Sequence, residues 1–221
     1  MFSEIDKTIF PDSCEVLEIT PSQHYVFPIF KCGKSSLYDS IHAKNWKIIV
    51  DDEIQKIQTP ITVYLRNPKS RFISGVNTYL QHIKRNFSEI DDKTALWFID
   101  QYLFLNRHYC PQFFWILNLS KFVNSNTKLY LCDYRDISKL TQIYSSAGVN
   151  PVTEDFLQLV EKFDWKRIEL YLYLDQILVD RLGQSFTIQE LIDIVYYQYP
   201  DVYKLIFNST LELFKHVLPS T

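Results

Sequence analysis

The segment Tyr25–Leu37, YVFPIFKCGKSSL, decides the fold that this sequence predicts. Its apolar first part, residues 25–30, has the composition of a buried strand, and apolar residues recur after the polar KCGKSS stretch at Leu37, Ile41 and Trp46. A strand–turn–helix junction leaves the first N–H groups of the helix without partners, and the helix dipole adds partial positive charge beside two lysines. The segment therefore predicts an anion-binding turn for a phosphate or a sulfate.

Three further segments have the short, apolar character of buried strands, namely residues 46–50, 61–65 and 128–132. Between them, the apolar spacing predicts helices at about 36–44, 69–85 and 94–108, and a further helix from the turn at 133–136 to about residue 145. The strand–helix–strand order of the first elements predicts that the strands at 25–30 and 46–50 pair in parallel. The aromatic segment 113–119 fits neither pattern.

The length of 221 residues suits a single domain. Residues 1–23 are expected to form a surface lead-in without chemistry, residues 24–150 a nucleotide-binding α/β core, and residues 151–221 a helical tail. In that tail we expect helices at 167–182 and 188–199. We therefore expect an α/β fold with three α/β/α layers, a short and mainly parallel central sheet, and a helical C-terminal part.

Composition narrows the classes of function. The apolar fraction of 47% argues against disorder, and the net charge of -3 argues against a nucleic-acid binder, so an anion site must be local. No apolar run is long enough for a membrane span and the N-terminus lacks a secretory pattern, which predicts a soluble, cytoplasmic protein. The four cysteines show neither CxxC pairing nor metal-ligand spacing, so we expect reduced thiols and no metal.

One interpretation of the opening segment is a P-loop. Gly33-Lys34-Ser35 matches the end of GxxxxGK[ST], but Pro28 stands where the first glycine should be. No later acidic strand end stands out as a magnesium partner. A P-loop kinase or phosphotransferase stays open as an alternative.

A second segment, Arg66–Ser74 with the sequence RNPKSRFIS, favours another interpretation. Together with Phe30–Leu37 it resembles the two nucleotide-binding motifs of the sulfotransferases that use 3'-phosphoadenosine 5'-phosphosulfate (PAPS), particularly the carbohydrate branch. The resemblance covers about residues 25–80 and implies the P-loop-like sulfotransferase fold. Two residues depart from the family pattern, since Phe30 replaces a proline and Lys34 replaces a small hydroxyl residue.

The resemblance also implies roles for individual residues. Lys31 would contact the 5'-phosphosulfate and neutralise charge on the bridging oxygen, while Arg66 and Ser74 would bind the 3'-phosphate. The implied donor-binding loop comprises Lys31, Cys32, Gly33, Lys34, Ser35, Ser36 and Leu37. PAPS would be the sulfonyl donor and 3'-phosphoadenosine 5'-phosphate (PAP) the product, without a metal.

The general base is the least determined part of this site. Relatives place a His or Glu near the position that Asp51, Asp52 and Glu53 occupy here, and His42 is the nearest histidine. Asp51 and Asp52 are the candidates, although such an acidic cluster is more often a solvated turn. The expected activity is sulfonyl transfer to a hydroxyl or amine acceptor, with a carbohydrate or other small molecule as acceptor. A non-catalytic nucleotide-binding module of the same fold is the second alternative.

Overall fold

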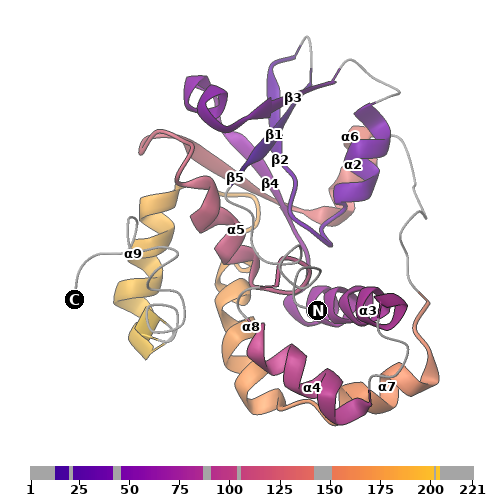
Figure 1. Cartoon of the computed structure of the whole chain (residues 1–221). Coiled ribbons are helices and arrows are strands. Elements are labelled where there is room, and N and C mark those ends of the chain that lie inside the picture. Colours follow the sequence, from indigo (N-terminus) through magenta and orange to yellow (C-terminus); the bar gives the residue numbers. More distant parts are fainter. Residues whose placement is uncertain are drawn as a thin grey trace.

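The computed structural model describes residues 13–19, 22–41, 46–86, 91–103, 106–141, 151–201 and 203–204. Within these ranges the chain forms an α/β structure around a six-stranded mixed sheet with the order β3-β1-β2-β4-β5-β6 (Figure 1). The strands are β1 Glu15–Ile19, β2 His24–Phe27, β3 Trp46–Val50, β4 Ile61–Leu65, β5 Lys128–Asp133 and β6 Ser185–Thr187.

The sheet has a parallel centre flanked by antiparallel strands. β4 pairs in parallel with both β2 and β5, whereas β1 is antiparallel to β2 and to β3, and β6 is antiparallel to β5. The prediction of a mainly parallel sheet is therefore wrong outside the centre. β3 runs in the same direction as β2, but β1 lies between them, so the expected direct pairing of these two strands is also wrong.

The inserted strand β1 lies within residues 1–23, which the sequence pattern assigned to a surface lead-in. Val16 and Leu17 of β1 are fully buried, and β1 pairs on both of its edges. The segment EVLEI is short and carries a glutamate at two of its five positions, so its apolar signal is weak. Pairing with two neighbouring strands makes it part of the sheet.

Most helices fall close to the expected positions. Their bounds are α2 Lys34–Ile41, α3 Pro68–Asn86, α4 Asp92–Gln101, α5 Gln112–Leu119, α6 Ile137–Thr141, α7 Glu154–Glu161, α8 Trp165–Val179 and α9 Ile188–Gln198, with 3-10 turns η1 Asp51–Lys56 and η2 Tyr134–Asp136. The helix expected at 94–108 ends at Gln101. The segment that no pattern placed is the helix α5, all eight residues of which are buried.

Helices cover both faces of the sheet, and side chains alternate between the two faces along each strand. On one face Leu17, Val26 and Tyr64 pack with Leu37 of α2 and Ile137 of α6. The other face packs in the larger core that includes α5 and α8, with Val16, Phe27 and Val63 among its strand residues. Figure 1 shows α2 and α6 on the opposite side of the sheet from α5 and α8.

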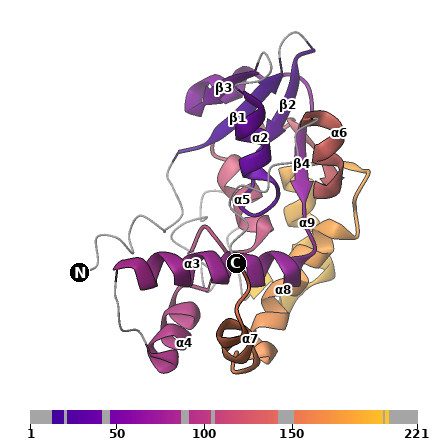
Figure 2. The same cartoon turned by 90° about the vertical axis from the view of Figure 1, so that its right-hand side faces the viewer.

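The parallel centre brings the sequence motifs to one edge of the sheet. Phe27 is in register with Val63, and Leu65 with Asp133, so the chain leaves β2, β4 and β5 at the same end. Figure 2 shows α3 following β4 directly and crossing beyond this end of the sheet. Among the helices that the structure describes, none is both long and apolar enough to cross a membrane.

Candidate functional site

The loop between β2 and α2 has an unusual backbone. Lys31 and Gly33 both adopt left-handed conformations, with φ of 64° and 81°, and the N–H of Cys32 donates to the carbonyl of Ile29 at 3.2 Å. The φ of Gly33 favours glycine, and a Cβ there would lie 2.4 Å from Cδ1 of Ile137, so that the end of the isoleucine side chain would have to shift. The sequence KCG thus folds into a tight turn ahead of α2.

The turn leaves the beginning of α2 open to an anion. The N–H of Leu37 donates to the carbonyl of Gly33 at 3.1 Å, as the first hydrogen bond of the helix. Within the described residues, the N–H groups of residues 33–36 have no hydrogen-bond acceptor. Such unpaired amides at a helix start are able to bind a phosphate or sulfate oxygen.

The segment Arg66–Ser74 reaches this loop through both of its arginines. Nη1 of Arg66 donates to the carbonyl of Lys31 at 3.4 Å, and Nε of Arg66 donates to Oγ of Ser70 at 3.2 Å. Nε of Arg71 donates to the carbonyl of Phe30 at 3.0 Å. The structure therefore brings together the two motifs that the sequence singled out. Ser74 lies further along α3 and is half-buried, and no hydrogen bond joins its side chain to Arg66 in the described part of the chain.

Positive charge accumulates at this contact. Burial, together with the charges of Arg66 and Arg71, lowers the pKa of the Lys31 ammonium. No ion pair joins Lys31, Arg66 or Arg71 to a carboxylate within the described residues. Nη2 of Arg71 is buried without a hydrogen-bond partner there. Lys31 and Arg66 therefore add positive charge at the loop that no carboxylate pairs in the described chain, whereas Arg71 is buried in the core.

Lys34 is used differently from Lys31. Its ammonium lies 3.6 Å from a carboxylate oxygen of Glu15 and over the rings of Phe30 and Tyr38, at 4.4 and 5.0 Å from their centroids. The hydroxyl of Tyr38 donates to the same glutamate. The charge of Lys34 is thus balanced by the carboxylate of Glu15 on β1, and Lys34 adds little free charge to the loop.

Phe30 is the centre of an aromatic and cationic cluster. Its ring stacks on Trp115 at 5.3 Å and meets His108 edge-on at 5.4 Å, while the guanidinium of Arg107 lies 5.3 Å from its centroid. A proline could not offer these contacts. Phe30 therefore ties the loop to the 106–110 turn and to α5.

The structure places the candidate bases away from the contact between Arg66 and Lys31. An Oδ of Asp51 accepts from the N–H of Cys14 at 3.0 Å, Asp52 is exposed, and Glu53 pairs with Lys47 at 3.7 Å. They follow β3, which β1 separates from β2 by two strand spacings, roughly 10 Å. The carboxylate that does reach the loop is that of Glu15. His42 lies outside the described residues.

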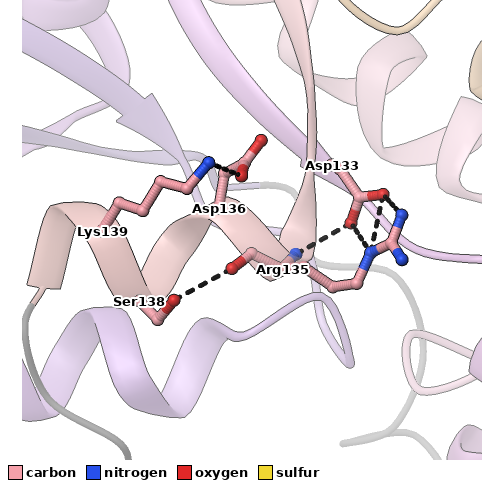
Figure 3. A network of polar contacts seen from close by, with 5 residues as sticks. All are labelled: Asp133, Arg135, Asp136, Ser138 and Lys139. Atoms are coloured by element: carbon pink, nitrogen blue, oxygen red, sulfur yellow. Dashed lines mark hydrogen bonds and ion pairs between the residues drawn. The ribbon is translucent and has the colours of Figure 1, made fainter.

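The turn after β5 also lies at this edge, and its charges are internally paired (Figure 3). The carboxylate of Asp133 accepts from the backbone N–H, Nε and Nη2 of Arg135, which lowers its pKa, and Asp136 pairs with Lys139 at 2.7 Å. Asp133 is therefore not a free carboxylate facing the loop after β2. Among the described residues, no group of three or more His, Cys, Asp and Glu side chains forms a metal cluster.

Sequence reasoning missed several residues that complete the site. Gln112 and Asp175 are almost fully buried and hydrogen-bonded at 3.1 Å beneath the loop, and Arg107 and His108 lie beside Phe30. Arg71 lies within the RNPKSRFIS segment, but the resemblance implies no role for it. Only the spacing of Arg66 and Arg71 carried a usable signal, because the other residues follow no motif and come from distant parts of the chain.

His108 gives a prediction about the pH dependence of stability. Burial, and the positive charges of Arg107, His82, Lys31 and Arg71, lower its pKa from 6.5 to about 3. Because the folded state has the lower pKa, this histidine costs no stability above pH 6.5 and destabilises the fold as the pH falls toward 3. Between pH 7 and pH 5 the wild type is expected to lose about 2 kcal/mol more unfolding free energy than His108→Gln.

Urea unfolding at the two pH values measures this difference. The matched control is His24→Gln, because His24 is only half-buried and its pKa is lowered by burial alone. Equal pH dependence in the wild type and in His108→Gln would show that His108 is not held neutral.

Comparison of the chain with protein-family models, with curated proteins and with solved structures finds no match.

Proposed function

We propose that this protein is a sulfotransferase that transfers a sulfonyl group from PAPS to a hydroxyl or amine acceptor, with a carbohydrate as the expected acceptor. The observation that carries the proposal is the contact between Arg66 and the carbonyl of Lys31 at 3.4 Å. It joins the two segments that resemble the 5'-phosphosulfate and 3'-phosphate motifs at one edge of the sheet. A sulfonyl donor such as PAPS carries anionic groups at two separate positions, and it needs such a pair of sites.

The charge balance supports the same proposal. The whole chain has a net charge of -3, yet the cluster around the loop contains more cations than carboxylates. The cations are Lys31, Lys34, Arg66, Arg71 and Arg107, and the carboxylates that act on them are Glu15 and Asp175. Local positive charge in a negatively charged protein favours binding of a polyanion at this place.

The residues of the loop suit the chemistry of sulfonyl transfer. In that reaction the acceptor oxygen or nitrogen forms a bond to sulfur as the bond from sulfur to the bridging oxygen breaks, and PAP leaves. The ammonium of Lys31 would stabilise negative charge on the departing oxygen, and Ser35, Ser36 and the amides of residues 33–36 would hold the phosphosulfate. Arg66 would bind the 3'-phosphate. The expected bases Asp51 and Asp52 follow β3, roughly 10 Å from β2, so neither is placed to take the acceptor proton at this loop.

The α/β/α layering and the P-loop-like sulfotransferase fold are also part of this proposal. The described structure supports them through the parallel strands β2, β4 and β5 and through helices on both sheet faces. A non-catalytic nucleotide-binding module is favoured by one observation, the hydrogen bond that engages Asp51 with the backbone of Cys14 at 3.0 Å. Both functions require the same nucleotide site.

Calorimetric titration with PAP tests the nucleotide site. The wild type is expected to bind PAP without a metal, and Arg66→Ala to weaken binding roughly 10- to 100-fold, because a hydrogen bond to a charged group contributes about 1.5–3 kcal/mol. Arg135→Ala is the matched control, since Arg135 belongs to the same sheet edge but is exposed and paired with Asp133. Its affinity should stay close to that of the wild type.

The P-loop alternative makes the opposite prediction. A P-loop phosphotransferase should bind ATP with magnesium more tightly than PAP, and it should be indifferent to Arg66→Ala. That pattern would overturn the proposed function.

A further inference from the structure

The side chain of Gln112, the first residue of α5, contacts both anion-binding segments. Its Oε1 accepts from the backbone N–H of Arg66 at 2.8 Å, and its Nε2 donates to the carbonyl of the same residue at 3.0 Å. Oε1 also accepts from the thiol of Cys32 at 3.0 Å. One amide thus fixes the backbone at the end of β4 and holds the loop that follows β2.

The orientation of this amide is determined by its partners. Nε2 donates its second hydrogen to Oδ2 of Asp175 at 3.1 Å, and Oδ1 of that aspartate accepts from the N–H of Phe113 at 3.1 Å. A flipped amide would direct its oxygen at the Asp175 carboxylate and its nitrogen at the N–H of Arg66. All hydrogen-bonding positions of the Gln112 amide are therefore used, and its side chain is fully buried.

The arrangement determines more than local packing. The guanidinium of Arg66 projects from a residue whose backbone N–H and C=O are both held by Gln112, and it reaches the carbonyl of Lys31 on the other segment. Cys32, the neighbour of Lys31, contacts the same amide. Gln112 thus joins the two segments from outside them, in addition to the direct hydrogen bonds of Arg66 to Lys31 and of Arg71 to Phe30, and it is the contact that fixes the backbone from which the Arg66 guanidinium projects.

We infer that Gln112 is a positioning residue that holds Arg66 in register with the Lys31–Gly33 loop, so that the two anionic ends of one nucleotide bind together as a single site. This inference rests on the proposed function. It concerns the coupling of the two segments, and Gln112 itself, buried beneath them, does not contact the nucleotide.

The test compares the binding of two nucleotides to the wild type and to variants of Gln112 and Arg66 by calorimetry. PAP carries both phosphates and adenosine 5'-phosphate lacks the 3'-phosphate, so the ratio of their affinities measures what the 3'-phosphate contributes. Gln112→Met keeps the side-chain volume and removes the amide. We expect this ratio to fall about 10-fold in Gln112→Met, toward the value for Arg66→Ala, while the affinity for adenosine 5'-phosphate changes much less.

If Gln112 had a purely structural role, Gln112→Met would lower the affinities for both nucleotides equally and leave their ratio unchanged. That result would overturn the inference. Asn118→Ala is the control for a lost buried polar group, because Asn118 is buried on the same helix and hydrogen-bonds to neither segment within the described chain. In the double variant Arg66→Ala/Gln112→Met we expect no further loss of the ratio. Wild-type protein that binds neither nucleotide would instead refute the proposed function, so the two failures are distinguishable.

Discussion

Replacing Arg71 with methionine is expected to lower the free energy of unfolding by about 3–5 kcal/mol, because two buried carbonyls lose their donor, at about 1–3 kcal/mol each, and the buried carboxylate of Asp175 loses a nearby positive charge. Arg71 has an exposed fraction of 1%, donates from Nη1 to the carbonyl of Cys110 at 2.5 Å, and donates from Nε to the carbonyl of Phe30. Its charge also acts on the buried carboxylate of Asp175, where it opposes the rise in pKa that burial causes. Methionine fills much of the volume but supplies none of these interactions.

Urea unfolding of the wild type and of Arg71→Met measures the effect. Lys69→Met is the matched control, since Lys69 lies on the same helix with an exposed ammonium over the ring of Trp165, and its loss should shift the midpoint far less. Adding Asp175→Asn to Arg71→Met should recover part of the loss, because the carboxylate that Arg71 compensates is then absent. A midpoint that Arg71→Met leaves unchanged would show that this arginine is not integral to the core.

The sequence predicts those elements whose apolar pattern is strong and local. The strands at 61–65 and 128–133 and the helix α3 appear within a residue or two of their expected positions, because each is bounded by proline, glycine or charged residues. β1 was missed because its position in the sheet depends on pairing with β2 and β3, which a local pattern does not contain. β1 accounts for two of the three antiparallel pairings, and β6, another short strand that no local pattern predicted, accounts for the third.

The contacts of the candidate site also divide into those that a local sequence pattern predicts and those that depend on the packed fold. The contact between the two motifs was predictable, since both follow parallel strands that end at one edge of the sheet. The roles of Gln112, Asp175 and Arg107 were not, because each comes from a different part of the chain and only the packed fold brings it to the loop. The pairing of Lys34 with Glu15 likewise depends on β1, the strand that the sequence pattern did not identify.

Replacing Lys31 with alanine is expected to slow sulfonyl transfer by about 10²–10³-fold, the usual cost of removing one donor that stabilises developing charge. The backbone of Lys31 is left-handed, with φ of 64°, and its carbonyl accepts from Arg66. Alanine carries the same Cβ and the same carbonyl, so it neither adds backbone strain nor removes that contact. The change therefore removes the ammonium together with its half-buried aliphatic chain, and it leaves the backbone of the turn as it is.

The measurement is the single-turnover rate of sulfonyl transfer from PAPS to an acceptor found by screening hydroxyl and amine compounds, with circular dichroism to confirm the fold. Lys34→Ala is the control, because the ammonium of Lys34 is already paired with Glu15 and should matter less to the rate. In the wild type, the second-order rate constant for transfer from PAPS should also fall as the pH rises. The fall should begin below pH 10.5, the usual lysine pKa, because burial, Arg66 and Arg71 all lower the pKa of Lys31 in the free protein. If Lys31→Ala transferred the sulfonyl group as fast as the wild type, the role proposed for this lysine would be excluded. If Lys34→Ala lost as much of the transfer rate as Lys31→Ala, the cluster would act through its total charge and not through the position of Lys31.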